Sequence, residues 1–488
     1  MSRAFALAVA VGLAACAAGP DFVRPRPPAV NRYLPGPDPV GNDAQRFVAG
    51  REVPADWWTA FGSAELDRLV ATAFRANPTV AAAQASLRQA RENLAAQRGA
   101  YLPTLGVAAS GSRNRNAVDV LSPTLTSGSA LFNLYTAQVN VAYTLDLFGA
   151  NRRAVEAQGA QADFSRWQLE ATYLTVAGNV VIAAIQLAGL DAQITATEQA
   201  IAGEREMLEI LRRQLEAGAV AGLDVAAQET ALAQTELALP PLRRQREAAR
   251  HLLAALTGRL PAEAGEPALA LEQLTLPAEI PLGVPSELVN RRPDVRAAEA
   301  TLHAACAAVG IAETNLLPQL TIGADLGSTA SASAELFKSY TRFWTAGATL
   351  TETLFAGGAL VHRVRAAEAG FDAAGAAYRG AVLAAFQNVA DALRALESDQ
   401  AALAAAERAA AAADRSLAIV RRQLDAGGAG YLAVLNAEQA HAQAVAALAQ
   451  ARAARYADTA ALYQAVAGPV PPTATGREPS PAQPGANR

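Results

Sequence analysis

The sequence is poor in the residues from which most catalytic and metal centres are built. Its 488 residues include two cysteines, two methionines and four histidines. It contains no Walker-type Gly-Lys-Ser/Thr segment, no Gly-x-Ser-x-Gly segment and no paired-cysteine zinc pattern, the short motifs that carry phosphate, nucleophile or metal chemistry. The histidines are widely separated in sequence: His251, His303, His362 and His441. We therefore predict that the chain is not an enzyme and holds no metal or dissociable cofactor.

The sequence also lacks a basic excess and a long apolar run. Lysine and arginine total 41 against 45 for aspartate and glutamate, the net charge is −4, and the arginines are scattered among acidic residues. This distribution argues against a nucleic-acid partner. The hydrophobic fraction of 52% is inflated by alanine, and no stretch after the N-terminus combines the length and apolarity of a spanning helix. We expect any membrane crossing to use another structure.

The N-terminus has the features of a bacterial lipoprotein leader. Arg3 precedes a short apolar run, residues 4–13, that ends in Leu-Ala-Ala-Cys at residues 13–16. This pattern predicts a signal peptide over residues 1–15 and a lipid-bearing, palmitoylated Cys16, although an alanine-rich signal can also carry a cysteine by chance. Ala17 is typical of lipoproteins sent to the outer membrane. With Cys16 acylated, Cys306 has no disulfide partner, and its alanine neighbours predict a small core residue.

Several motifs occur twice, in the same order and at nearly the same spacing. Asn77-Pro78 is echoed by Arg292-Pro293, and Leu102-Pro103 by Leu317-Pro318. The run Arg-Arg-Gln-Leu-Glu-Ala-Gly at 212–218 returns as Arg-Arg-Gln-Leu-Asp-Ala-Gly at 421–427. A repeat of this kind indicates a duplicated structural unit.

Each copy is predicted to contain a helix, a β-hairpin, a very long helix, a tight turn and a final helix. After a lipidated extended segment, 16–62, the first repeat covers 63–270, with a helix over 64–100, a hairpin over about 103–146, a long helix to 217 and a helix over 223–258. The second repeat covers 271–467, with a helix over 286–316, a hairpin over about 318–355, a long helix to 426 and a helix over 430–466. Alternating apolar residues mark the strands, and the Pro/Gly/Ala-rich tail, 468–488, is expected to be disordered.

The long helices carry a heptad pattern, which indicates coiled-coil packing. The helical pattern is uninterrupted over about 150–217 and 359–426, or roughly 100 Å each at the α-helical rise. The apolar heptad positions are Leu187, Ile194, Ile201, Leu208 and Leu215 in the first copy and Leu396, Leu403, Ala410, Leu417 and Leu424 in the second.

Four strands in one chain cannot form a closed membrane barrel. An open sheet edge leaves unpaired backbone groups that hydrocarbon does not tolerate. Three chains would supply twelve strands, within the range of outer-membrane barrels. We therefore predict a mainly α fold with a membrane β-barrel: a homotrimer whose twelve-stranded barrel is continued by a periplasmic α-helical barrel. A periplasmic helical protein with incidental hairpins is the soluble alternative, but it does not explain why the hairpins alternate and are duplicated.

Three further runs carry a family resemblance. They are Gly-Pro-Asp-Phe at 19–22, Trp57-Trp58 leading through Phe61 and Leu66 into Asn77-Pro78, and the block from Gly283 to Glu299. From Cys16 to about Gly468, the chain resembles the TolC-like outer-membrane factors, specifically the lipoprotein branch that serves resistance-nodulation-division (RND) efflux systems.

The resemblance implies a passive exit duct for drugs or other small toxic compounds. An inner-membrane RND pump would supply the energy, a periplasmic adaptor would join the pump to the duct, and outer-membrane lipid would surround the barrel. A type I protein-secretion duct and a structural coiled-coil lipoprotein are the alternatives. The pump and adaptor select the cargo in such systems, so the sequence does not specify it.

A duct of this type must be shut when it is undocked, and the resemblance places the gate at the two helix turns. Gly218 and Gly427 would reverse the chain there. The pore-narrowing positions of the family match Leu432 and Asn436, and the sequence departs from the family because Asn436 replaces an acid. We expect Leu432 to form a hydrophobic constriction and Asn436 to attract cations less than a carboxylate ring would. Ordinary surface residues at the turn are the alternative.

Charged residues near the turns suggest a latch for the closed state. The basic members are Arg212, Arg213, Arg421 and Arg422, and the acidic members are Glu216, Asp224 and Asp425. Exposed ion pairs contribute only about 0 to 1 kcal/mol each, so several must act together. Solvated surface charge is the alternative.

Overall fold

The computed structural model describes residues 17–30, 32–35, 45–115, 131–263 and 265–469. The chain forms two compact units. Unit 1 comprises Met1–Arg24, Arg88–Phe164 and Ala298–Tyr378, and unit 2 comprises Pro25–Leu87, Ser165–Ala297 and Arg379–Arg488. Each unit therefore draws on both sequence repeats. The predicted signal peptide, the predicted lipidation at Cys16 and residues 470–488 of the predicted tail lie outside the described residues.

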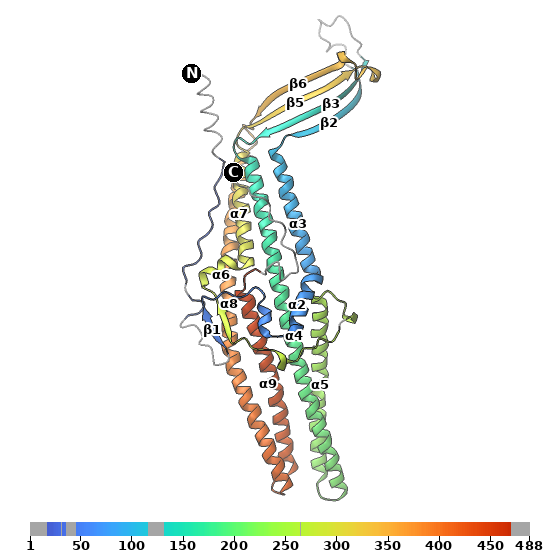
Figure 1. The fold of residues 1–488 in the computed structure, drawn as a ribbon, viewed down its shortest axis with the longest axis vertical. Coiled ribbons are helices and arrows are strands. Elements are labelled where there is room, and N and C mark those ends of the chain that lie inside the picture. Colours follow the sequence, from blue (N-terminus) through green and yellow to red (C-terminus); the bar gives the residue numbers. More distant parts are fainter. Residues whose placement is uncertain (1–16, 31, 36–44, 116–130, 264, 470–488) are drawn as a thin grey trace. The chain divides into compact units, whose positions relative to one another are not determined.

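Unit 1 contains a four-stranded antiparallel sheet in the order β2-β3-β5-β6 (Figure 1). Its strands are β2 (Thr104–Arg115), β3 (Leu131–Leu145), β5 (Gln319–Ala330) and β6 (Arg342–Thr351). The two hairpins are joined by pairing of β3 with β5, with Leu145 opposite Leu320. Among the described strands, β2 and β6 each pair on one side only, so both edges of the sheet are open.

The two faces of this sheet differ in polarity, because strand side chains alternate between faces. One row of partners crosses all four strands as Val107, Val139, Leu326 and Trp344, and all four side chains are exposed. The next row, on the opposite face, is Gly106, Asn140, Asp325 and Thr345, in which the Thr345 hydroxyl donates to Asp325 Oδ2 at 3.0 Å. The sheet thus has an apolar face and a polar face.

Long helices make up most of the rest of the chain. Four of them contribute residues to both units: α3 (Pro78–Arg98), α4 (Ala150–Glu216), α7 (Pro293–Thr314) and α8 (Ala359–Asp425). The others belong to unit 2: α2 (Ala64–Ala76), α5 (Gly222–Leu256), α6 (Pro285–Arg291) and α9 (Tyr431–Val466). Helices α4 and α8 each have 67 residues, which agrees with the duplicated heptad pattern.

Two helices that we predicted to be continuous are broken. The helix over 64–100 divides into α2 and α3 at Asn77, and the helix over 286–316 divides into α6 and α7 at Arg292. Each break precedes a proline, which disfavours helical backbone in the preceding residue; Asn77 has ψ 124° and Arg292 has ψ 123°. The proline then begins the next helix, where its missing N–H is no loss.

Unit 2 also contains a strand pair that the sequence did not indicate. Strands β1 (Arg46–Ala49) and β4 (Glu279–Leu282) pair in parallel. Nearby, the short 3₁₀ helix η1 (Trp57–Phe61) inserts three buried aromatic rings into the core, where Trp57 stacks on Tyr463 with ring centroids 5.7 Å apart. The end of the predicted N-terminal segment, residues 57–61, is thereby packed into the unit 2 core.

Helix α4 corrects the expectation that no internal stretch has the composition of a spanning helix. It holds an 18-residue window with a mean hydropathy of 1.7, of which 72% is buried. That burial is explained by the unit 2 core, where Val180, Val181 and Ile185 of α4 are all fully buried. The apolarity of α4 therefore serves protein packing.

Candidate functional site

Helices α4 and α8 both end in unit 2, and each ends in the same type of turn. After α4, Gly218 has φ 70°, and the Ala219 amide donates to the Gln214 carbonyl at 2.8 Å. After α8, Gly427 has φ 71°, and the Gly428 amide donates to the Gln423 carbonyl at 2.7 Å. These are Schellman turns, in which glycine tolerates the left-handed backbone. They produce the helical hairpins α4–α5 and α8–α9.

The two turns lie close together at one end of unit 2, which we call the helical tip (Figure 1). Leu208 and Leu211 of α4 and Val225 of α5 form a small buried cluster there, and Tyr431 of α9 packs against it. The Tyr431 hydroxyl also donates to Gln214 Oε1. The two hairpins therefore contact each other at the tip through both apolar and polar groups.

Two of the four predicted latch arginines form ion pairs within the protomer, and both use an acid on the other helix of their own hairpin. Arg212 lies 2.9 Å from Glu229 Oε1, and Arg421 lies 2.9 Å from Glu438 Oε1. Both partners are 17 residues further along the chain. The Arg–Glu pair is thus duplicated together with the helices. The sequence repeat contains both pairs at the same spacing.

The acids that we predicted as latch partners do not pair with these arginines in the described tip. Arg212 has Glu209 as its second partner at 3.2 Å, and Arg422 donates to the Ala418 carbonyl at 3.1 Å. Asp224 instead accepts from the Ala221 amide at 3.1 Å, at the start of α5. Five of the predicted latch residues therefore take part in no ion pair within the described part of the protomer: Arg213, Arg422, Glu216, Asp224 and Asp425.

The predicted gate residues face away from the packing of their own protomer. Leu432 is 60% exposed, and Asn436, one helical turn further along α9, is also exposed. Between and beside them, Val434, Leu435 and Glu438 are buried. Leu432 and Asn436 therefore share an unpacked helix face.

In unit 1, one buried arginine holds the segment that follows Cys16. We call residues 17–24 the N-terminal strap. The Arg153 side chain, only 5% exposed, donates to the carbonyls of Ala18 and Gly19 at 3.1 and 3.2 Å and to Asp21 Oδ1 at 2.7 Å. Its remaining contact is with Glu156 at 2.8 Å. The strap is thus tied to α4 by its backbone as well as by a side chain.

Helix α7 supplies the other side of the strap site. His303 stacks on Phe22 with ring centroids 4.3 Å apart, and the buried Cys306 thiol donates to the Pro20 carbonyl at 3.5 Å. A Cβ atom on Gly19 would lie 2.3 Å from Gly310 Cα, and Gly19 has φ 86°. The contacts of Gly19, Asp21 and Phe22 therefore account for these three residues of the Gly-Pro-Asp-Phe run, and Pro20 is held through its carbonyl.

The strap site also changes the acidity of its members. Burial alone would raise the pKa of Glu156, but hydrogen bonds from Arg153 and His303 outweigh it and lower that pKa. His303 Nε2 lies 2.8 Å from Glu156 Oε1. Burial raises the pKa of the Cys306 thiol, and a thiol kept protonated is a poor nucleophile. The contacts of the site hold residues 17–24 against α4 and α7.

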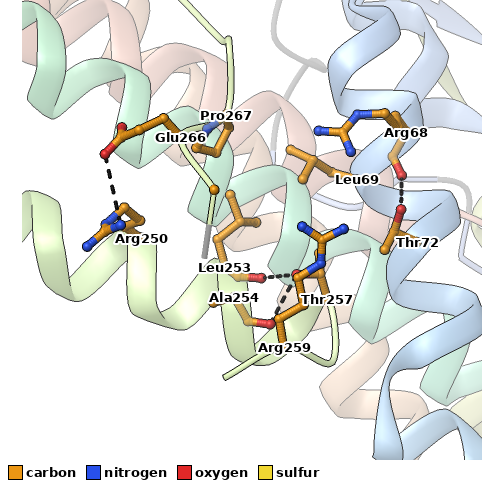
Figure 2. Close-up of a pocket in the computed structure, with 11 residues that line it drawn as sticks. Arg68, Leu69, Thr72, Arg250, Leu253, Ala254, Thr257, Arg259, Glu266 and Pro267 are labelled. Carbon is orange, nitrogen blue, oxygen red and sulfur yellow. Dashed lines mark hydrogen bonds and ion pairs between the residues drawn. The ribbon is translucent and has the colours of Figure 1, made fainter. Parts of the chain in front are cut away.

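A small cavity of about 60 Å³ in unit 2 is lined by three arginines (Figure 2). Arg68 pairs with Glu65 at 2.5 Å, and Arg250 pairs with Glu247 at 2.6 Å. The Thr257 hydroxyl at the end of α5 donates to the carbonyls of Leu253 and Ala254. Close by, the Asn77 amide donates to the Leu256 carbonyl at 2.9 Å. These contacts fix the end of α5 against the end of α2, and we assign the cavity to packing.

Among the described residues, no group of three or more His, Cys, Asp or Glu side chains is placed to hold a metal ion. The functional features of the protomer are therefore an amphipathic sheet with open edges, a fixed N-terminal strap, and a helical tip with an exposed Leu432 and Asn436.

Known proteins match the chain over most of its length. It is 30% identical over 453 residues to the pyoverdine export outer membrane protein OpmQ of Pseudomonas putida, covering 91% of this chain and 94% of that protein. It is 31% identical over 400 residues to the outer membrane protein OprJ of Pseudomonas aeruginosa, covering 80% of each. The solved outer-membrane channel OprN superposes with a TM-score of 0.82 at 28% identity, covering 93% of this chain and 99% of that one.

The match extends to a whole family. The family described as outer membrane efflux protein covers residues 69–259 and 284–468. It is a family of efflux channels, not of enzymes, and its fold of long helices with a β-sheet confirms the predicted fold class. This result sets aside the alternative of a purely structural coiled-coil lipoprotein. The chain belongs to the outer membrane efflux protein family.

Proposed function

We propose that three copies of this chain form an outer-membrane exit duct for a tripartite efflux pump. The observation that carries this proposal is the sheet of unit 1, with an apolar row across all four strands, a polar row behind it and two open edges. Apolar residues outside and polar residues inside are the pattern of a water-filled barrel. Three such sheets would supply twelve strands and leave no edge exposed to lipid.

The helices of the same three chains would continue the barrel into the periplasm. The long α4 and α8 and their partners α5 and α9 have many exposed small and apolar residues in the single protomer, including Leu223, Leu237 and Leu383. Neighbouring protomers would cover such faces. At the tip, Leu432 and Asn436 would line the narrowest part of the pore.

We propose a lipid on Cys16 as a second membrane attachment. The strap that begins at Ala17 is held against α4 and α7 by Arg153, His303 and Cys306. A lipid on the preceding residue would then be attached to a fixed point of the protein. The N-terminal strap would hold the proposed lipid on Cys16 close to the protein, and the barrel would form the channel.

The cargo that we propose is small organic toxic compounds, including drugs. One relative is named for pyoverdine export and others for antibiotic or toluene efflux, which supports small molecules as a class. We further propose an inner-membrane RND pump as the source of energy and a periplasmic adaptor as the connection to it. The Arg212–Glu229 and Arg421–Glu438 pairs would stabilise the undocked tip.

Two matched substitutions on adjacent β-sheet rows test the duct. Leu326→Arg places a charge on the apolar row, where it should face lipid, and should cost about 2 to 4 kcal/mol near the bilayer centre. Thr345→Arg places the same charge on the polar row. We expect Leu326→Arg to reduce the trimer recovered from outer membranes, and Thr345→Arg to leave its amount unchanged while shifting planar-bilayer currents toward anion selectivity. Equal effects of the two substitutions would contradict the proposed faces.

A further inference from the structure

The helical tip contains two buried acids that the proposed duct does not explain. Glu204 of α4 is 2% exposed and Glu438 of α9 is 8% exposed. Each has one buried carboxylate oxygen, Oε2, with no hydrogen-bond partner. An ionised oxygen in this situation loses its hydration without compensation, which is costly. The two acids must therefore be stabilised by something other than the donors that now contact them.

The existing donors reach only one oxygen of each acid. Glu204 Oε1 accepts from the Thr235 hydroxyl at 2.9 Å, and Glu438 Oε1 accepts from Arg421 at 2.9 Å. Both acids line one cavity of about 250 Å³ between α4, α8 and α9. The cavity lies where the α4–α5 hairpin meets the α8–α9 hairpin.

The other charged groups around this cavity do not neutralise the pair. On α5, Glu236 is paired with Arg205 at 2.5 Å. Asp414 of α8 lies 3.8 Å from His441 of α9, and both line the cavity. The cavity is thus lined by three carboxylates, of Glu204, Glu438 and Asp414, and by one arginine, Arg421. Like charges in a buried site favour retention of a proton by one of them.

The raised pKa of Glu204 agrees with its burial and with the carboxylates near it. Burial raises its pKa, and the charges of Glu438 and Glu236 raise it further, against the lowering effect of the Thr235 hydrogen bond. A protonated Glu204 is neutral and gains an O–H donor. A proton on Glu204 would therefore remove the cost of burying its charge beside Glu438 in this cavity.

We propose that Glu204, which lines the same cavity as Glu438, is a proton-binding site that couples closure of the helical tip to periplasmic pH. The inference rests on the proposed duct, in which separation of the two hairpins opens the tip. With a proton bound, the hairpins stay in contact across the cavity. Without it, two buried carboxylates line the same cavity, and their repulsion separates α4 from α9.

The direction of the pH effect follows from the raised pKa of Glu204. The folded joint binds a proton more tightly than the separated one, so the stabilisation is complete below the ordinary glutamate pKa and is lost as the pH rises through the raised value. Low pH therefore keeps the two hairpins of the tip in contact, and high pH favours their separation. A divalent cation held by the same acids would do the opposite, because it needs both of them deprotonated.

The test is the single-channel conductance of the reconstituted, full-length protein between pH 5 and pH 8. Wild type should conduct more as the pH rises. Glu204→Gln, a neutral side chain of the same shape, should keep the acid-state conductance throughout and lose the pH dependence. Glu229→Gln is the matched control, because it removes the exposed counterpart of Glu438 in the other hairpin, and it should retain the dependence. His441→Gln should also retain it, which separates Glu204 from the Asp414–His441 pair.

Circular dichroism and the trimer mass of Glu204→Gln establish that the variant folds, and spin labels on α4 and α9 report the hairpin separation directly in wild type. Wild-type pH dependence in folded Glu204→Gln, or a wild-type separation that does not change with pH, would overturn the proposal. The proposal would also be overturned if magnesium closes the tip at pH 8 in wild type but not in Glu204→Gln, because that result assigns the site to a metal. A protein that forms no channel at any pH would instead refute the proposed duct.

Discussion

At the residue scale, the duplicated Arg–Glu pair has different surroundings in its two copies. Arg212 and Glu229 are about equally exposed, with side-chain exposures of 49% and 50%. Arg421 is 54% exposed, but its partner Glu438 is only 9% exposed. Duplication therefore preserved the pair while the packing against α4 buried one of its acids. The same contact is an ordinary surface ion pair in one hairpin and part of a buried joint in the other.

This difference predicts unequal costs for the two arginines. Arg212→Ala should cost about 0 to 1 kcal/mol, as is usual for an exposed pair. Arg421→Ala leaves a buried Glu438 without a donor and should cost about 1 to 3 kcal/mol. Hydrogen exchange at the α8–α9 and α4–α5 turns measures both local stabilities. Equal protection losses in the two variants would show that burial of Glu438 has no energetic consequence.

Arg153 predicts the behaviour of the N-terminal strap. Arg153→Met should speed hydrogen exchange over residues 17–24, because it removes donors to two strap carbonyls and to Asp21. Arg152→Met is the neighbouring control, since Arg152 contacts Asp146 and not the strap. In wild type, the lowered pKa of Glu156 means that its contribution is present above the ordinary glutamate pKa and is lost as the pH falls through the lowered value. Strap protection that is equal in both variants would refute the role of Arg153.

The ion-pair partners of these arginines are predictable from the sequence only in part. The latch prediction places the acids close in sequence to the arginines, at Glu216, Asp224 and Asp425, whereas the partners in the protomer lie across the turn. The register of the repeat pairs Glu229 with Glu438 and could have identified them. Nothing local, however, indicates that Glu438 lines the same cavity as Glu204 of the other hairpin, because that placement depends on how the hairpins pack.

At the element scale, periodic and duplicated features were predictable and long-range pairings were not. The long helices α4 and α8 end within a residue of the predicted positions, because heptads continue up to a glycine turn. The breaks at Asn77 and Arg292 were missed because a proline at the first position of a helix is compatible with an unbroken apolar pattern. The β1–β4 pair joins two four-residue segments from opposite halves of the chain, for which no local signal exists.

The glycine turns themselves can be tested. Gly427→Ala should destabilise the α8–α9 turn by roughly 1 to 2 kcal/mol, because its φ of 71° is a left-handed conformation that Cβ disfavours. Gly428→Ala is the matched control, since a Cβ there would meet only the Gln423 carbonyl at an ordinary 3.6 Å. Hydrogen exchange of residues 424–430 measures both variants. If Gly428→Ala loses as much protection as Gly427→Ala, the left-handed backbone at Gly427 does not explain the loss.

At the scale of the whole molecule, a single chain has an incomplete sheet. Its open edges at β2 and β6 are tolerable in lipid only when another chain pairs with them. The alternating hairpins made this conclusion accessible from sequence, since the alternation predicted two of them and therefore four strands. The pairing of β3 with β5 joins the hairpins into one sheet whose apolar row continues across all four strands. Closure by three copies is therefore the claim on which the duct, the gate and the proton site depend.

The most direct test of closure is native mass spectrometry of the full-length protein extracted from outer membranes in detergent. The account predicts one species with the mass of three protomers, with the edge strands β2 and β6 protected from hydrogen exchange to the same extent as the central β3 and β5. A monomer, or β2 and β6 that exchange freely while β3 and β5 are protected, would contradict it.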